Sequence, residues 1–199
     1  MDAGLWNTRY TTTGYVYGTI PNAFVAEVAA QIPAGPVLCL AEGEGRNAVH
    51  LAVLGHAVTA VDLSAVALAK ARRLAAERGV SLATVVTDLV EYRIAPGTWS
   101  GIVATFMHLP PLLRREVLVQ AVAGLAPGGV FVFEAYTPSQ LAYDTGGPRD
   151  LGLLVTAAQL REELVGLDLV IARELERDVR EGTGHTGRGA VVQILGRRP

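Results

Sequence analysis

Residues 37–47 read Val37-Leu38-Cys39-Leu40-Ala41-Glu42-Gly43-Glu44-Gly45-Arg46-Asn47, and this stretch decides the fold. The apolar run from Pro36 to Leu40 predicts a buried strand that ends in a glycine-containing turn. A helical pattern follows from Arg46 to Leu54, and Gly55 ends it. Because glycine has no side chain, such a turn lets backbone approach a ligand closely. The stretch therefore predicts the first strand–turn–helix unit of a parallel sheet.

The same alternation of strand and helix continues along the chain. Further helices are expected at Ala65 to Arg78, where Ser64 can cap the first turn, and at Leu112 to Gly124, preceded by Pro111 as first helical residue. Strands separated by helices of about ten to fifteen residues imply right-handed crossovers and a parallel sheet. The further strands expected are Ala57 to Val61, Leu82 to Val86, Gly101 to Phe106 and Val130 to Ala135.

The pattern changes after Tyr136. Thr156 and Gln159 form a capping box for a helix that runs to Val165. The segments Leu167 to Leu175 and Ala190 to Leu195 then predict two strands with no helix between them. Their connection, Glu176 to Gly189, is polar and rich in glycine, which favours a loop within an antiparallel hairpin.

The predicted fold is therefore a Rossmann-like α/β fold, with a doubly wound, mostly parallel seven-stranded sheet and a C-terminal antiparallel hairpin. We expect one domain over residues 1–199. An N-terminal arm and helix occupy 1–33, a cofactor-binding core 34–136, and a C-terminal helix and hairpin 137–199.

Composition supports this fold and excludes several classes of protein. Half of the residues are hydrophobic, and mean hydropathy is +0.33, which suits a sheet buried on both faces. The formal net charge of -2 offers no basic field for nucleic acid. The single cysteine, Cys39, excludes an internal disulfide and a cysteine-based metal cluster, and we expect no metal. With no export signal and no membrane-length apolar run, a cytoplasmic location without a membrane partner is expected.

Three features gather where the strands of such a sheet end, which is where open α/β sheets bind ligands. Gly43 and Gly45 leave backbone exposed, and Asp62 can accept hydrogen bonds from both hydroxyls of a ribose. Asp88, or the backbone of its neighbour Leu89, can contact an adenine amino group. Each feature alone is also typical of an ordinary turn or helix start. Together they predict an adenosine site.

A nicotinamide-dependent dehydrogenase is the main alternative, because Gly43-x-Gly45-x-x-Ala48 fits its looser glycine fingerprint. Two observations oppose it. Glu42 and Glu44 would repel a pyrophosphate, whereas they can face the ammonium and sulfonium groups of S-adenosylmethionine. A closing hairpin also differs from the second mononucleotide-binding half of a dehydrogenase. S-adenosylmethionine is therefore the expected cofactor.

These motifs resemble the class I S-adenosylmethionine-dependent methyltransferases. Residues 37–45 are similar to their first motif, Val61-Asp62-Leu63-Ser64 to the ribose-binding strand end, and Thr87-Asp88-Leu89 to the adenine-side motif. Leu125-Ala126-Pro127-Gly128-Gly129 is similar to the loop before their fifth strand. Within the class, the small tellurite-resistance and thiopurine-type methyltransferases are the nearest likeness. That likeness is carried by Trp6-Asn7-x-Arg9-Tyr10, Tyr17-Gly18-x-x-Pro21-Asn22 and Glu181-Gly182-x-x-His185.

The resemblance implies a cofactor site, and the N-terminal arm is expected to close over it. The residues expected to bind the cofactor are Arg9, Tyr17, Glu42, Gly43, Gly45, Asp62, Leu63, Asp88, Leu89 and Phe106.

Two residues depart from the family pattern. Cys39 stands where the family has an acid that orients the methionine end of the cofactor, and Ala41 stands where it has glycine. Glu42 or Glu44 can compensate for the lost acid. The methyl group of Ala41 should be tolerated only where the backbone keeps a negative φ. A non-catalytic module that binds S-adenosylmethionine therefore remains an alternative.

Methyl transfer requires no metal and no covalent nucleophile, since the enzyme mainly holds the acceptor beside an activated methyl group in a dry pocket. The expected acceptor is a small molecule, such as a thiol or a tellurium or selenium oxyanion. The candidate catalytic residues are His185 and Arg188, in the expected hairpin loop, and His108. A backbone-bonded core histidine at His108 and a solvated loop at His185 are the alternative readings. The sequence pattern carries no signal on oligomeric state.

Overall fold

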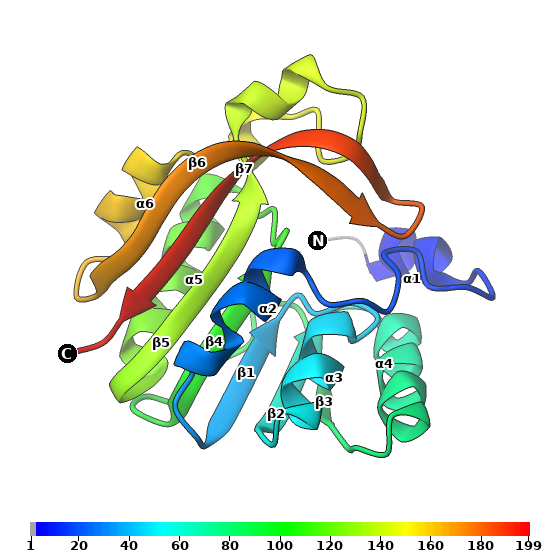
Figure 1. Cartoon of the computed structure of the whole chain (residues 1–199), viewed down its shortest axis with the longest axis horizontal. Helices are drawn as coiled ribbons and strands as arrows, with labels where there is room; N and C mark the ends of the chain where they lie inside the picture. The colour runs from blue at the N-terminus through cyan, green and yellow to red at the C-terminus, as the bar shows by residue number, and fades with distance from the viewer. Residues whose placement is uncertain (1–2) are drawn as a thin grey trace.

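The chain is described over residues 3–199 in a computed structural model, and it folds around a sheet of seven strands (Figure 1). The strands are β1 (Pro36–Leu40), β2 (Ala57–Asp62), β3 (Ala83–Val86), β4 (Trp99–Thr105), β5 (Leu125–Tyr136), β6 (Asp168–Glu181) and β7 (His185–Arg197). Their order across the sheet is β3-β2-β1-β4-β5-β7-β6. β1 to β5 pair in parallel, whereas β7 is antiparallel to both β5 and β6. The predicted fold is confirmed.

Helices cover both faces of the sheet (Figure 1). They are α1 (Ala3–Tyr10), α2 (Ala23–Val28), α3 (Arg46–Val53), α4 (Ala65–Glu77), α5 (Pro111–Gly124) and α6 (Ala157–Glu163), with 3₁₀ turns at Ala29–Gln31, Pro138–Ala142 and Leu151–Leu153. Cys39 packs with α2, α3 and α4 on one face, and Leu38 packs with α5 and α6 on the other. Because successive strand residues point to opposite faces, β1 must be apolar throughout.

Local signals in the sequence account for the helix boundaries. The Ser64 hydroxyl accepts a hydrogen bond from the Ala67 amide at 3.1 Å, as its capping position predicts. Thr156 and Gln159 form the expected capping box, and Pro111 is the first residue of α5. None of the described helices is long and apolar enough to cross a membrane.

The expected loop from Glu176 to Gly189 is wrong. β6 continues to Glu181 and β7 begins at His185, so the turn of the hairpin is only three residues long. Glycine in this segment serves close packing within a strand rather than loop mobility. A Cβ atom at Gly189 would lie 3.1 Å from the ring of Tyr136. The hairpin is consequently long and rigidly paired, and its tip lies beside α1 (Figure 1).

Two residues at the carboxyl edge of the sheet have strained backbones. Ala41 follows β1 with a φ of 49°, and Phe106 follows β4 with a φ of 52°. The negative φ on which tolerance of Ala41 was expected to depend is absent, and this alanine adopts a left-handed conformation. Such conformations cost about 1–3 kcal/mol each and cluster at functional sites. Both residues lie at the carboxyl ends of the neighbouring strands β1 and β4, and the strand order reverses between these two strands.

Gly45 is required for two separable reasons, and Gly55 provides a matched control. Gly45 has a φ of 92°, and a Cβ atom there would lie 2.6 Å from Cβ of Ala71. Gly55 has a similar φ of 96°, but a Cβ atom would meet nothing within 4 Å. Gly55→Ala should therefore cost only the left-handed penalty of about 1–2 kcal/mol. Gly45→Ala should cost about 1–3 kcal/mol more, because α3 and α4 must separate. Urea unfolding measures both, and equal losses would contradict the close approach.

Candidate active site

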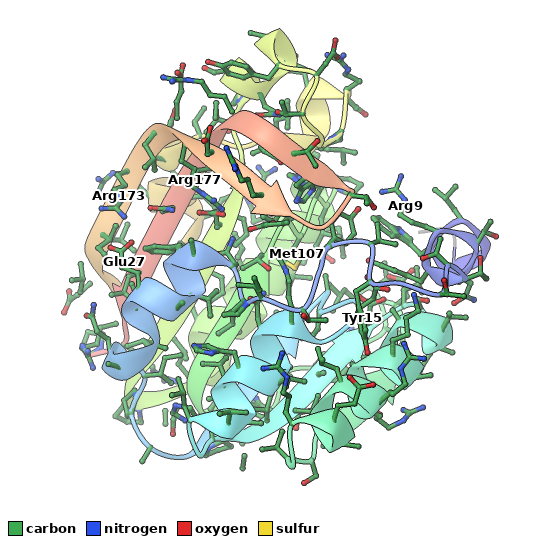
Figure 2. The ribbon with its side chains drawn as sticks, turned by 45° about the vertical axis from the view of Figure 1, so that its right-hand side comes forward. Arg9, Tyr15, Glu27, Met107, Arg173 and Arg177 are labelled. Carbon is green, nitrogen blue, oxygen red and sulfur yellow. The ribbon has the colours of Figure 1, made fainter. Side chains whose placement is uncertain are left out.

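A cavity of about 560 Å³ lies at the carboxyl ends of β1, β2 and β4. Its volume falls in the range of roughly 300–1,000 Å³ that is usual for small-molecule sites. Arg9 reaches it from α1, and Met107 from the segment after β4 (Figure 2). The other walls are the glycine turn after β1, the tip of the β6–β7 hairpin and residues 146–153. Those of the expected site residues that line it are Arg9, Tyr17, Glu42, Gly43, Asp62, Leu63, Leu89, Phe106, His108 and His185.

Asp62 and the glycine turn meet as the sequence predicts. One carboxylate oxygen of Asp62 accepts a hydrogen bond from the Gly43 amide at 2.8 Å, and the other accepts from the Ser64 amide at 2.8 Å. Burial raises the pKa of Asp62, and these amides oppose that shift. The amides fix the carboxylate at the end of β2, where its remaining lone pairs can accept from ribose hydroxyls.

The two glutamates of the turn have different surroundings. Glu42 lines the cavity and accepts hydrogen bonds from the Asn47 and Ala48 amides, at 3.0 and 2.8 Å, at the start of α3. Burial raises the pKa of Glu42 to about 7. Glu44 also lines the cavity, but it forms an ion pair with Lys70 at 2.7 Å. Since Cys39 lies wholly in the core, Glu42 is the acid that can replace the one the family has on the strand.

Arg46 is a site residue that the sequence analysis missed. Its Nη2 atom lies 2.7 Å from a carboxylate oxygen of Glu181. Its Nη1 atom is buried without a hydrogen-bond partner among the described residues, and the side chain lines the cavity. An unpaired guanidinium nitrogen fits the carboxylate of the methionine part of S-adenosylmethionine. The available signal was its position in the first turn of α3. A helix N-terminus attracts anionic groups, and an arginine at the same place adds a positive charge for them.

The expected adenine side is only partly reproduced. Leu63, Thr87 and Leu89 line the cavity and supply an apolar surface with backbone groups. Asp88 is not among the lining residues, and its carboxylate accepts a hydrogen bond from the Val90 amide at 3.1 Å. Of the two options in the sequence analysis, the geometry therefore favours the backbone of Leu89. Gly45 likewise packs against α4 rather than lining the cavity.

The N-terminal arm forms one wall of the cavity, as expected. Arg9 donates a hydrogen bond to the hydroxyl of Tyr17 at 2.9 Å, and its guanidinium lies 5.0 Å from the ring centroid of Trp6. The buried Tyr10 closes the gap between α1 and the glycine turn, where its hydroxyl would be 3.0 Å from a Cβ atom at Gly43.

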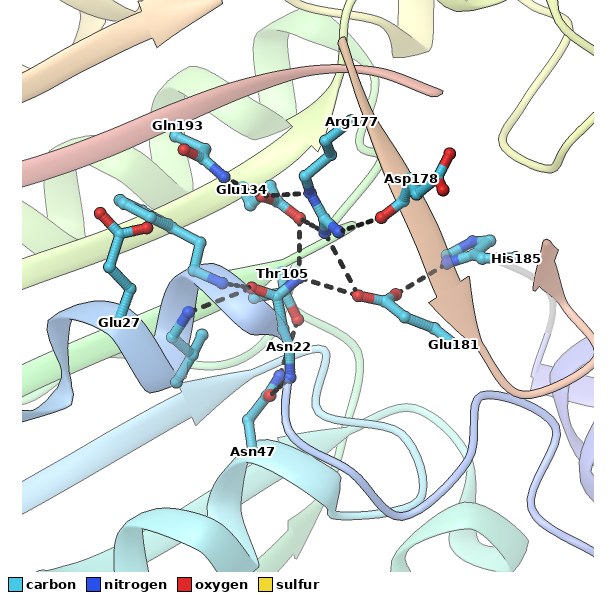
Figure 3. Close-up of polar contacts among 12 residues, drawn as sticks. Asn22, Glu27, Asn47, Thr105, Glu134, Arg177, Asp178, Glu181, His185 and Gln193 are labelled. Atoms are coloured by element: carbon cyan, nitrogen blue, oxygen red, sulfur yellow. Dashed lines mark hydrogen bonds and ion pairs between the residues drawn. The ribbon is translucent and has the colours of Figure 1, made fainter. Parts of the chain in front are cut away.

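His185 is buried inside a group of aromatic rings. Its ring centroid lies 4.7 Å from that of Tyr17, 4.5 Å from Phe106 and 5.3 Å from Tyr136. Its Nδ1 atom is 3.1 Å from a carboxylate oxygen of Glu181 (Figure 3). Burial alone would raise the pKa of Glu181, but His185 and Arg46 lower it to about 2. Glu181 is therefore an anion that holds the hydrogen of His185 on Nδ1.

Glu181 belongs to a buried network that joins distant parts of the chain (Figure 3). The amide nitrogen of Asn22 donates to Glu134 at 2.7 Å and to Glu181 at 3.0 Å. Arg177 pairs with the same two carboxylates, and Gln193 donates to Glu134 at 2.5 Å. The charges of the two carboxylates are thus balanced by the guanidinium groups of Arg46 and Arg177. This balance makes the burial of all four groups tolerable.

The structure separates the two residues that were expected to act together in the hairpin. Arg188 is exposed on β7, and it forms an ion pair with Glu176 on β6 at 2.7 Å. It is not among the residues that line the cavity. Because strand residues alternate in direction, His185 and Arg188 face opposite sides of β7. His108 does line the cavity, and its Nδ1 atom lies 3.1 Å from the carbonyl oxygen of Leu153.

The Rossmann-like sheet, the acid at the end of β2, the glycine turn and the cavity at the strand ends form the arrangement expected of a nucleoside-cofactor site. Residues 37–129 match the family model described as a methyltransferase domain. This match supports the interpretation of the chain as a class I S-adenosylmethionine-dependent methyltransferase.

Named relatives and solved structures agree with this class. The chain is 30% identical over 131 residues to the 2-heptyl-1-hydroxyquinolin-4(1H)-one methyltransferase of Mycobacteroides abscessus, a match that covers 64% of this chain and 56% of that relative. TehB from Haemophilus influenzae superposes with a TM-score of 0.74 at 20% identity, over 99% of this chain and 67% of that one. The N-methyltransferase NodS from Bradyrhizobium japonicum, in complex with S-adenosyl-L-homocysteine, superposes with a TM-score of 0.71 at 18% identity, over 99% and 98%.

The position of Asp62 yields a binding prediction, with Asp88 as its control. Asp62→Ala should weaken S-adenosyl-L-homocysteine binding by about 1–3 kcal/mol, the usual loss for a hydrogen bond to a charged group. Asp88→Ala should change affinity little, since Asp88 lies outside the cavity lining. Titration calorimetry on both variants tests this. Equal affinities in the two variants would contradict the proposed ribose contact.

The buried carboxyl of Glu42 yields a prediction about pH. Its pKa is raised from 4.5 to about 7, so its contribution to stability is complete below about 4.5 and is lost as the pH rises through about 7. Glu42→Gln keeps an oxygen acceptor for the α3 amides but does not titrate. Between pH 5 and 8 the unmodified protein should therefore lose about 1–3 kcal/mol more unfolding free energy than the variant. The exposed Glu162→Gln is the control, and parallel pH profiles for the Glu42 pair would contradict the assignment.

Proposed function

We propose that this protein transfers a methyl group from S-adenosylmethionine to an acidic hydroxyl group of a small heteroaromatic molecule, with His185 as proton acceptor. The observation that carries the proposal is the pair of His185, which lines the cavity, and the buried Glu181 behind it, 3.1 Å apart. With its hydrogen held on Nδ1 by an anionic carboxylate, the His185 ring keeps a lone pair on Nε2. That nitrogen can take the proton of an acceptor group, and Glu181 then stabilises the charged ring.

The remaining residues provide binding and a dry environment. S-adenosylmethionine supplies a methyl group that is already activated on a sulfonium. On its side of the cavity, Asp62 provides a ribose acceptor, Glu42 a carboxyl, and Arg46 a guanidinium whose Nη1 atom has no partner among the described residues. Tyr17 and Phe106 pack on the two sides of His185 and keep water from the nucleophile.

The choice of a hydroxylated heteroaromatic acceptor rests on the character of the cavity and on one relative. Aromatic and aliphatic side chains dominate the walls near His185, which suits a flat, apolar molecule. The Mycobacteroides abscessus relative is named for a hydroxyquinolone, whose hydroxyl group is acidic enough to be methylated with the help of one base.

A thiol is the second candidate acceptor, because the same base would generate the thiolate that attacks. A tellurium or selenium oxyanion is less favoured, since it needs no proton acceptor and requires cations. Among the described lining residues the guanidinium groups are Arg9 and Arg46, and the expected third cation, Arg188, lies elsewhere. The alternative of a non-catalytic binding module would not account for the buried Glu181–His185 pair beside the cavity.

A labelled-methyl assay tests this function. With 2-heptyl-1-hydroxyquinolin-4(1H)-one, His185→Ala should reduce methyl transfer by about 10²–10⁴-fold, the usual contribution of a general base. Its affinity for S-adenosyl-L-homocysteine should stay nearly unchanged. His50→Ala, a change on α3 outside the cavity, is the control and should keep full activity. Full turnover by His185→Ala would remove the histidine from the mechanism, and transfer only to thiols or tellurite would replace the proposed acceptor.

A further inference from the structure

His108 presents a buried hydrogen-bond acceptor that nothing in the protein uses among the described residues. A carbonyl oxygen can only accept, so the 3.1 Å contact with Leu153 places the hydrogen of the ring on Nδ1. The other nitrogen, Nε2, then carries a lone pair. Nε2 is shielded from solvent and has no partner in the part of the chain that the structure describes. Burial also lowers the pKa of His108 to about 4, which keeps the ring neutral at physiological pH.

His108 lines a part of the cavity whose other side chains carry no charge. Besides His108, the lining here comes from two segments, 105–109 after β4 and 146–153 before α6. None of their lining side chains is charged; they are Thr105, Phe106, Met107, Leu109, Gly146, Gly147, Pro148 and Leu153. The charged lining residues come from α1, the glycine turn, the start of α3 and the end of β2. The lining from these two segments is therefore neutral, and we call this part the neutral end of the cavity.

Glycine backbone packs closely on aromatic rings beside the neutral end. A Cβ atom at Gly146 would lie 2.7 Å from Cδ2 of His185, and one at Gly147 would lie 2.6 Å from Cδ2 of Tyr136. Tyr136 in turn stacks on His108 with an interplanar angle of 4° and centroids 5.7 Å apart. No larger residue fits at either glycine without moving a ring. The two glycines therefore bring residues 146 and 147 directly onto the rings that flank the cavity.

The two histidines are close enough to act on one molecule. Phe106 packs near both, with its ring centroid 6.2 Å from that of His108 and 4.5 Å from that of His185. Tyr136 contacts both as well, at 5.7 and 5.3 Å. A bicyclic molecule that donates to His108 would thus have its far edge near His185. An anion at this end would lose its hydration, and the lining from segments 105–109 and 146–153 supplies no cation to replace it.

On the basis of the proposed function, we propose that His108 and the neutral end of the cavity form the recognition site for the acceptor, which is a planar, uncharged heteroaromatic molecule that donates one hydrogen bond to Nε2 of His108 from a group other than the hydroxyl that His185 deprotonates. His108 is a positioning and specificity residue, whereas proton removal belongs to His185. A donor that reaches Nε2 satisfies a buried acceptor, and a molecule of the same shape without a donor leaves it unpaired.

Binding of small probes tests the recognition site without any methyl transfer. The probes are indole, which has a ring N–H donor, 1-methylindole, which has the same ring and no donor, and the anionic indole-5-carboxylate. Each is titrated by calorimetry into the protein saturated with S-adenosyl-L-homocysteine. We expect indole to bind about fivefold to a hundredfold more tightly than 1-methylindole, the range for a lost hydrogen bond at a buried acceptor. The carboxylate should bind most weakly.

Variants of His108 assign the preference to its Nε2 atom. His108→Leu keeps an apolar side chain but removes the acceptor, so indole and 1-methylindole should bind with equal affinity. His108→Gln offers a carbonyl oxygen and should restore part of the preference. Thermal unfolding with and without S-adenosyl-L-homocysteine shows that each variant still folds and binds the cofactor product.

The outcomes separate this proposal from the proposed function. Equal binding of the two neutral probes to the unmodified protein, or an unchanged preference in His108→Leu, would overturn the recognition site even where methyl transfer is observed. A preference that depends on His108, in a protein that methylates none of the tested acceptors, would support the recognition site and refute the proposed reaction.

Discussion

The site depends on the ion pairs and hydrogen bonds that the carboxylate of Glu181 makes. This carboxylate is buried, it contacts Arg46 at 2.7 Å and His185 at 3.1 Å, and the amide of Asn22 donates to it at 3.0 Å. A buried anion is tolerable only when its partners are in place, so α3, the segment before α2 and both strands of the hairpin must all reach their positions. The same contacts that stabilise the charge also fix the orientation and tautomer of His185. Fold and chemistry thus share one ionic centre.

Most of the fold could be predicted because its signals are local. The apolar strand before Gly43, the Ser64 cap and the Thr156–Gln159 capping box each specify a boundary within a few residues of chain. The hairpin was predicted with too long a loop, because glycine was taken as a sign of mobility. In the structure Gly189 makes room for the ring of Tyr136, a contact across the sheet that no local pattern contains.

The cofactor side of the site was also largely predictable, since the turn after β1 and the acid after β2 recur at fixed places in such sheets. The acceptor side was not. His185 gains its role from Glu181 four residues earlier and from Arg46 on α3, and neither partner was expected. Arg188 was grouped with His185 by sequence proximity, yet the alternation of β7 turns it to the opposite side. Likewise, the carbonyl of Leu153 decides which nitrogen of His108 is free.

The long hairpin also determines when the site can form. Its turn is tied to the N-terminal segment by hydrogen bonds from the amides of Thr183 and Gly184 to the carbonyl oxygen of Val16, at 2.8 and 3.0 Å. These contacts join residues that are far apart in the sequence, and loop closure over such separations slows folding. On the ribosome the first five strands can emerge and pair before β7 exists, whereas the cavity has no wall at His185 until β7 has emerged. A nascent chain therefore acquires its parallel strands before it acquires the wall of the cavity at His185.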